Sequence, residues 1–251
     1  MRVERVPAPY KPERLPHAKW KHRMSKRMTL VIGAFCVNGM VFCSDTEEGT
    51  SLGGKRDVHK LFEYPGDDWR MVVGTAGFGP LCDIAAKRIG VKTTDADFIQ
   101  KHNAHLSKVI RELYKQYIPD TLSEQKQYDR QIWLVIGIIN RQANERFLYL
   151  TTEEILQPIQ HPYACAGAGQ EIAYYLLDRL FDTSLKYVEA AELLKFVMRE
   201  AKASVGGVGG NTEMITVMDD AKGAIREQLA PGWEAKQPRL ENNITKFWTG
   251  N

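Results

Sequence analysis

Apolar residues along the chain fall into short runs that are typical of strands, separated by turn-forming residues. The first two runs, Leu30–Val37 and Met40–Cys43, flank the pair Asn38-Gly39. An Asn-Gly pair between two such runs predicts a β-hairpin. Further runs predict strands at Lys60–Tyr64, Trp69–Gly74, Gln131–Ile139, Glu145–Leu150, Tyr163–Ala166 and Thr212–Met218.

Four other segments repeat their apolar residues at the spacing of a helix. They are Leu81–Ile89, a long helix that Thr94 caps and Pro119 ends, a helix opened by Gly167-Ala-Gly169, and a helix that starts at Thr183 or Ser184. The predicted inner face of the long helix carries Phe98, His102, Leu106, Val109, Ile110, Leu113 and Tyr117. We interpret such stripes as core rather than as cofactor sites.

The order of these elements is strands, a helix pair, strands, a second helix pair and a final strand. The runs Leu30–Val37 and Ile132–Ile139 are apolar on both faces, which is typical of strands covered on two sides. We therefore expect an α+β fold of four layers (αββα), with two antiparallel sheets between two helical layers. The domain is expected to span residues 29–218, after a leader at 1–28 and before a C-terminal extension at 219–251.

Charge is distributed unevenly along the chain, whose formal net charge is +3. Residues 1–28 contain nine Lys and Arg against two Glu, together with four prolines, whereas residues 29–251 carry 25 basic and 29 acidic side chains. The predicted domain is mildly acidic, which argues against a nucleic-acid partner. The leader is basic and Pro-rich without a periodic apolar pattern, which indicates an extended segment.

The leader ends in Met24-Ser-Lys-Arg-Met28, directly before Thr29. Three interpretations stay open. The leader is a propeptide whose removal exposes Thr29, or translation begins at Met28 and that methionine is removed, or the leader is a permanent tail. The first two interpretations make Thr29 the first residue of the working protein.

The remaining composition argues against several classes of protein. No run approaches the length of ~18 apolar residues that spans a membrane, and the N-terminus lacks a secretory signal, so we expect a cytoplasmic protein with no membrane contact. The cysteines show no metal-type spacing, and His102 with His105 fits a solvated helix edge, so no metal or other cofactor is expected. We expect buried reduced thiols at Cys36, Cys43, Cys82 and Cys165.

A candidate site follows from the predicted hairpin. Thr29 precedes its first strand and Asp45 ends its second, so both are expected at the same end. Lys60 follows beyond a Gly-rich segment, so a hydroxyl, a carboxylate and a lysine can converge there. This trio suits amide chemistry if Thr29 becomes the first residue of the chain. A later strand ends at Gly77 before a helix. The Gly77 N–H is then the natural oxyanion donor, and the alternative is an ordinary strand-to-helix turn.

These residues together resemble a known family. The matching positions are Thr29, Asn38-Gly39, Asp45, Lys60, Ala76-Gly77, Gly167-Ala-Gly169 and Gly209-Gly210. In order and spacing they are similar to the proteasome β-subunit and to the peptidase of the bacterial two-component ATP-dependent protease. Both are N-terminal-nucleophile (Ntn) hydrolases of the αββα fold. The likeness covers residues 29–218, and only the interval from aspartate to lysine is one residue shorter than in the family.

The resemblance implies a threonine-type endopeptidase and a role for each matched residue. The Thr29 hydroxyl would be the nucleophile and its freed α-amine, which titrates near ~7.7–8, the general base. Lys60 would lower the pKa of that amine and stabilise the threonine oxygen, and Asp45 would orient Lys60. The Gly77 N–H would stabilise the tetrahedral oxyanion.

The resemblance also implies a substrate site and partners. Thr75 and Gly79 would line the specificity pocket for a peptide substrate, with Glu47 and Glu48 adding negative charge nearby. By the same likeness we expect a homo-oligomer, ring-shaped as in the relatives, and an ATPase as a further partner.

Five positions depart from the family pattern, and three of them would lie near the amine. Leu30 stands in place of the usual second threonine, and Met28 in place of the glycine that commonly precedes the cleavage point. Ala168 stands where the family has a serine near the amine, and Val205 and Val208 stand where it has an aspartate and a serine. Loss of this polar support would leave the amine poorly oriented, unless Ser204 or Asn211 replaces it. The alternative function is therefore a non-catalytic ring or scaffold subunit of proteasome fold, and a third is an Ntn amidase for a small molecule.

Overall fold

The computed structural model describes residues 29–49, 54–119, 121–220 and 223–229. The expected leader at 1–28 lies outside these residues, as does most of the expected extension at 219–251. The described chain contains two five-stranded sheets and a two-stranded ribbon. The ribbon joins β3 (Glu47–Gly49) to β4 (Lys55–Asp57), neither of which the sequence analysis predicts.

The first sheet has the strand order β10-β1-β2-β11-β12, and all its neighbouring strands are antiparallel. Its strands are β1 (Val31–Cys36), β2 (Gly39–Asp45), β10 (Tyr163–Ala166), β11 (Thr212–Met218) and β12 (Ala224–Leu229). The pairing of β1 with β2 confirms the predicted hairpin. β12 lies within the expected C-terminal extension, and it adds an edge strand to this sheet.

The second sheet has the strand order β5-β6-β7-β8-β9, again antiparallel throughout. Its strands are β5 (Leu61–Pro65), β6 (Trp69–Gly77), β7 (Ile132–Asn140), β8 (Glu145–Thr152) and β9 (Ile155–Pro158). Four of these strands match predicted apolar runs. β9 was not predicted, because it is too short to show a pattern of its own.

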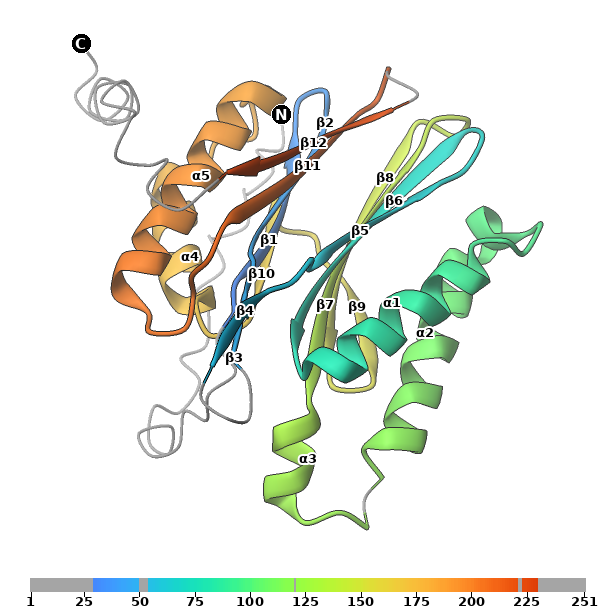
Figure 1. The fold of residues 1–251 in the computed structure, drawn as a ribbon. Helices are drawn as coiled ribbons and strands as arrows, with labels where there is room; N and C mark the ends of the chain where they lie inside the picture. Colours follow the sequence, from blue (N-terminus) through green and yellow to red (C-terminus); the bar gives the residue numbers. More distant parts are fainter. Residues whose placement is uncertain (1–28, 50–53, 120, 221–222, 230–251) are drawn as a thin grey trace, which may run out of the picture.

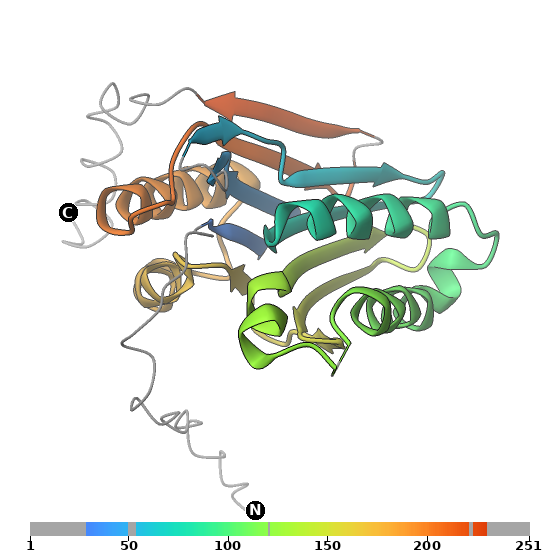
Figure 2. The ribbon, with the colours of Figure 1, turned by 60° about the horizontal axis from the view of Figure 1, so that its bottom comes forward.

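Two helix pairs form the outer layers (Figure 1). α4 (Gln170–Leu180) and α5 (Tyr187–Ser204) pack on the first sheet, whereas α1 (Gly79–Lys92) and α2 (Phe98–Tyr117) pack on the second. The two pairs also lie on opposite sides of the sheets in Figure 2. The expected αββα sandwich is therefore confirmed. A short helix that was not predicted, α3 (Glu124–Arg130), precedes β7.

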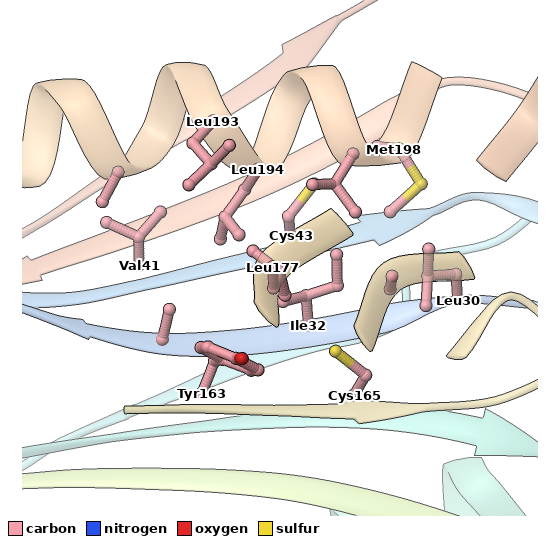
Figure 3. Packing of buried hydrophobic residues seen from close by; sticks show 14 of the residues in the cluster. Leu30, Ile32, Val41, Cys43, Tyr163, Cys165, Leu177, Leu193, Leu194 and Met198 are labelled. Carbon is pink, nitrogen blue, oxygen red and sulfur yellow. The ribbon is translucent and has the colours of Figure 1, made fainter. Parts of the chain in front are cut away.

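Both faces of the first hairpin are buried, as its apolar pattern requires. Leu30 and Val41 lie in one cluster with Leu194 of α5, which Figure 3 shows from close by. The opposite face carries Val31 and Phe42, which belong to the cluster between the two sheets. The hairpin is therefore held on two sides, and its open end is fixed relative to both helices and the second sheet.

The hairpin turn differs in detail from the prediction. Cys36 pairs with Gly39, so the two turn residues are Val37-Asn38, one position before the predicted Asn38-Gly39. Gly39 belongs to β2, and a Cβ there would lie 2.1 Å from the carbonyl oxygen of Val217 in β11. Glycine is thus needed at this position for the close approach of a neighbouring strand rather than for the turn.

Two details of the long helix also differ from the sequence analysis. α2 begins at Phe98, and the Thr94 hydroxyl does not cap it but donates to the carbonyl of Val91 at 2.8 Å. His102 is buried, with its Nε2 atom 2.8 Å from the hydroxyl of Tyr149. Its predicted place on the inner face is confirmed, whereas its placement with His105 at a solvated edge is wrong. A polar residue can take a core position when a buried partner satisfies it.

Candidate active site

The open end of the first hairpin brings the candidate residues together. Thr29 lies two residues before the start of β1, and Asp45 is the last residue of β2. Val31 pairs with Ser44, so the start of β1 and the end of β2 are neighbours. Lys60 comes directly before β5 of the second sheet, and its side chain bridges from that sheet to Asp45 in the first.

The side chains of Thr29, Asp45 and Lys60 are in direct contact, and we call them the buried cluster. Lys60 Nζ donates to Thr29 Oγ1 at 2.5 Å and to Asp45 Oδ1 at 3.0 Å. The Thr29 hydroxyl donates to Asp45 Oδ1 at 2.5 Å. All three residues are buried, so water screens the charge of Lys60 only weakly at the threonine oxygen. This arrangement favours negative charge on Oγ1, as a nucleophilic hydroxyl requires.

The Asp45 carboxylate is satisfied from several directions. Besides the Thr29 hydroxyl and the Lys60 ammonium, it accepts the backbone N–H of Leu30 at 2.9 Å and that of Gly209 at 3.1 Å. A fully buried carboxylate is costly unless it is paired and hydrogen-bonded. These donors offset that cost and fix the direction in which Asp45 presents its oxygens to Lys60.

The loop Gly167-Ala-Gly169 holds the backbone of Thr29. The N–H of Gly169 donates to the Thr29 carbonyl oxygen at 3.3 Å. Gly167 has a φ of +101°, and a Cβ there would lie 2.3 Å from the same oxygen. A side chain at position 167 would therefore push Thr29 out of place.

The structure places Thr75 against Lys60, and Gly77 at the end of β6. The Thr75 N–H donates to the Lys60 carbonyl at 2.9 Å, so β6 holds the backbone next to the buried cluster. Gly77 has a φ of +113°, and a Cβ there would lie 2.3 Å from the carbonyl oxygen of Gln131. Only glycine fits such a turn. Gly77 is two residues beyond Thr75 in the strand that borders the cluster.

Gly79 contacts Glu48 rather than the buried cluster. A Cβ at Gly79 would lie 1.7 Å from Glu48 Oε1, so the carboxylate rests directly against the first residue of α1. The positive end of the helix dipole stabilises an anion at this place. Arg56 pairs with Glu48 at 2.6 Å. An acidic side chain and its counterion therefore occupy the space next to Gly79.

Comparison with known proteins identifies the family that shares this architecture. A family model described as proteasome subunit matches residues 26–217, which include the buried cluster and the Gly167-Ala-Gly169 loop. The chain belongs to the proteasome subunit family. The search of curated proteins found no match.

Solved structures of Anbu proteins have the fold of this proteasome-type chain. Anbu (ancestral beta-subunit) from Yersinia bercovieri is 14% identical with a TM-score of 0.71, over 88% of this chain and 94% of that one. Anbu from Hyphomicrobium sp. strain MC1 is 15% identical with a TM-score of 0.69, over 88% and 94%. The Pseudomonas aeruginosa Anbu complex, described as a helical assembly, is 13% identical with a TM-score of 0.70, over 88% and 93%.

The three departures from the family pattern near the expected amine are apolar residues, and all three are at least partly buried. Val208 is buried and Val205 is partly buried in the cluster under α4 and α5, and Ala168 is half-buried. Neither Ser204 nor Asn211, the two polar residues that could replace the missing groups, points toward these three residues. Ser204 is exposed, and the Asn211 amide contacts Asp57 at 3.4 Å. This proteasome-type site thus combines a polar buried cluster with an apolar wall.

One residue of the site was missed by the sequence analysis. Glu213, the second residue of β11, is buried, and its carboxylate accepts the backbone N–H groups of Lys60 at 3.3 Å and of Leu61 at 3.4 Å. A single charged residue, Glu213, inside the predicted strand Thr212–Met218 was the available signal. A buried acid needs partners, and sequence alone does not show which ones.

The cysteines of this proteasome-type chain are poor candidates for a nucleophile. All four are free and buried, which confirms the expectation of reduced buried thiols. Burial raises the pKa of Cys36 to about 11 and the pKa values of Cys43 and Cys82 to about 12, and it also raises the pKa of Cys165. The thiols therefore stay protonated at neutral pH, and a protonated thiol is a poor nucleophile.

Two further classes of site were sought in the part of the chain that the structure describes. Within it, His, Cys, Asp and Glu side chains form no group of three or more that could hold a metal ion. Its helices include none that combines the length and the apolar character needed to cross a membrane.

Proposed function

We propose that this chain is a proteasome-like threonine hydrolase that cleaves peptide or other amide bonds, with Thr29 freed by processing as its nucleophile. The contact of Lys60 Nζ with both Thr29 Oγ1 and Asp45 Oδ1 carries this proposal. A lysine ammonium against a threonine hydroxyl, buried and balanced by one carboxylate, suits a hydroxyl that must bear negative charge during attack.

In the proposed reaction, Thr29 Oγ1 forms a bond to the substrate carbonyl carbon while its proton passes to the freed α-amine. The tetrahedral intermediate then breaks its C–N bond, and the proton moves from the α-amine to the leaving amine. A water molecule attacks the carbonyl carbon of the resulting ester and gives one proton to the α-amine of Thr29. The C–Oγ1 bond breaks, the acid product leaves, and Oγ1 recovers its proton.

The other site residues have supporting roles in this proposal. The Gly77 N–H would donate to the oxyanion, an interaction worth about 3–4 kcal/mol where one such donor has been removed in another hydrolase. Thr75 and Gly79 would line the pocket for the substrate side chain next to the scissile bond. The Glu48 carboxylate against Gly79 would limit the size of that side chain.

We further propose that the working protein is a cytoplasmic homo-oligomer, with a ring as the expected form and an ATPase as a further partner. Support for assembly comes from the Pseudomonas aeruginosa Anbu complex, whose structure is described as a helical assembly. The family match extends the argument, because proteasome subunits act in assemblies.

A non-catalytic ring or scaffold subunit is the second candidate function. The apolar residues Val208, Val205 and Ala168 favour it, since they stand where the family carries polar groups near the threonine amine. A protein of this kind would keep the fold and the buried cluster without releasing an N-terminal threonine.

Intact mass of the purified full chain, before and after an epoxyketone or β-lactone probe, separates the two candidates. The hydrolase predicts a chain that begins at Thr29 and gains one probe adduct. Thr29→Ala should lose the adduct, while Thr152→Ala, an exposed threonine of β8, should keep it. A chain that keeps residues 1–28 and gains no adduct would exclude the hydrolase and favour the scaffold.

A further inference from the structure

Glu213 is a buried carboxylate that links the two sheets beside the active-site end. It is 1% exposed and is the second residue of β11. Ile215 and Val217, at alternate positions of the same strand, belong to the cluster between the sheets, so Glu213 shares their face. A charged group in this layer is expensive unless donors surround it.

Donors do surround the Glu213 carboxylate, and they come from both sheets. Its Oε2 atom accepts the backbone N–H groups of Lys60 at 3.3 Å and of Leu61 at 3.4 Å. Its Oε1 atom lies 2.7 Å from Arg226 Nη1 and 3.0 Å from His59 Nδ1. Because a carboxylate is an acceptor only, His59 must carry its proton on Nδ1 for this bond.

Arg226 completes the link from β12. Its Nη2 atom donates to the carbonyl oxygen of Leu61 at 3.1 Å while Nη1 binds Glu213. One guanidinium therefore holds the carboxylate and the first residue of β5 in a fixed relation. A strand in the expected C-terminal extension is thereby connected to the backbone next to Lys60.

The backbone of Lys60 is thus held from two directions. Thr75 of β6 donates to its carbonyl oxygen, and Glu213 accepts its N–H. We propose that Glu213 is a positioning residue for Lys60, and that Arg226 of β12 holds Glu213 in that role. This proposal rests on the proposed function, because the position of Lys60 Nζ next to Thr29 affects catalysis only if the chain is a threonine hydrolase.

The replacement Glu213→Gln tests this role. Gln keeps the size of the side chain but replaces one acceptor oxygen with an NH₂ donor. In either orientation of the amide, this donor faces another donor, which is the Arg226 guanidinium or the N–H groups of Lys60 and Leu61. We expect the rate constant of probe labelling at Thr29 to fall about 100-fold, the effect of a displacement of about 1 Å. The final labelling of one probe per chain should be retained, since each correctly folded molecule still reacts.

A matched control is Glu227→Gln, which removes the same charge one residue from Arg226. Glu227 pairs with Lys195 of α5 at 3.3 Å. The rate constant of probe labelling in Glu227→Gln should equal that of the wild type. An unchanged rate constant in Glu213→Gln would overturn the proposal. So would a lower final labelling at an unchanged rate constant, because that result reports loss of folded protein only.

A second readout does not depend on activity. In a crystal structure of Glu213→Gln, we expect Lys60 Nζ to lose its contact with Asp45, which is 3.0 Å in the native chain. A preserved contact would overturn the positioning role even if labelling slowed. If the wild-type chain takes no probe, the proposed hydrolase fails, and this crystal structure still decides whether Glu213 positions Lys60.

Discussion

Gly167 and Thr29 approach each other so closely that no side chain fits between them. A Cβ at Gly167 would lie 2.3 Å from the Thr29 carbonyl oxygen and 3.0 Å from its γ-methyl group. The φ of Gly167, +101°, is also one that L-residues rarely adopt. The glycine therefore sets the position of the proposed nucleophile, although it contributes no chemical group.

Gly167→Ala should displace Thr29 and destabilise the chain. The unfavourable φ alone costs about 1–2 kcal/mol, and the clash adds to it. We expect a lower urea midpoint and slower probe labelling of Thr29. Gly206→Ala is the control, since a Cβ there meets no atom within 4 Å. Equal stability of the two variants would contradict the proposed close approach.

Lys60→Met should abolish labelling of Thr29 while the proposed assembly persists. Methionine fills the space of the lysine stem but leaves Asp45 without its buried counterion. Removing one partner of a buried pair costs about 3–5 kcal/mol. The N–H groups of Leu30 and Gly209 still donate to Asp45, so the fold should survive this loss. Probe labelling, urea unfolding and size-exclusion chromatography measure the three effects.

Lys55→Met is the control for Lys60→Met. Lys55 forms a pair with Glu47, but its own side chain is 69% exposed. Exposed pairs contribute about 0–1 kcal/mol, so stability and labelling should stay close to those of the wild type. Labelling that survives in Lys60→Met would exclude the role proposed for that lysine.

Glu48→Ala should widen the substrate preference of the proposed hydrolase. The carboxylate lies against Gly79, so its removal opens space beside the segment that would bind the substrate side chain. We expect kcat/KM for peptides with a bulky apolar residue before the cleaved bond to rise relative to peptides with alanine there. Glu63→Ala, which removes an acid of β5 that pairs with Arg70 of β6, should leave this ratio unchanged. The same ratio in both variants would show that Glu48 does not border the pocket.

Two buried thiols should weaken the fold at alkaline pH. Burial raises the pKa values of Cys43 and Cys82 from 9.0 to about 12. The folded state then keeps protons that the unfolded chain releases, so their stabilising effect is complete below pH 9 and is lost as the pH rises from about 9 to about 12. Each thiol contributes a fall of up to about 1.4 kcal/mol per pH unit in that window.

Urea unfolding at about pH 8 and about pH 10.5 checks this prediction. The wild type should lose more stability between the two conditions than Cys82→Ala, because other titrating groups contribute equally to both proteins. An identical loss in the two proteins would contradict the raised pKa of Cys82.

The elements that sequence predicted well are those with a strong local pattern. The run Leu30–Val37 and the Asn38-Gly39 pair were sufficient for the first hairpin, because a strand period and a turn involve only adjacent residues. The helix α3 and the strands β3, β4, β9 and β12 were missed, since they are short or have no apolar repeat. The boundary of α2 was misplaced because Thr94 has the residue type of a cap but bonds backwards to Val91.

The residues of the candidate site also fall into those that local sequence predicted and one that it did not. The spacing of Thr29 and Asp45 along one hairpin follows from the strand period. Lys60 was placed with them because it follows the Gly-rich segment after Asp45, and the resemblance to the family gave the three residues their roles. Glu213 could not be found in this way, because it is 153 residues from Lys60 in sequence and meets it only where the sheets pack together. Its burial and its partners are properties of that packing.

By itself, the sequence determined the strands and helices that have a strong apolar pattern, their order, and the end of the hairpin where Thr29 and Asp45 meet. Only the tertiary structure decided that Gly39 serves the approach of β11, that Glu48 lies against Gly79, and that β12 reaches Lys60 through Arg226 and Glu213. The physical reason is the sequence separation of the residues that interact. Local periodicity is set by neighbouring residues, whereas these contacts depend on how two sheets from distant parts of the chain face one another.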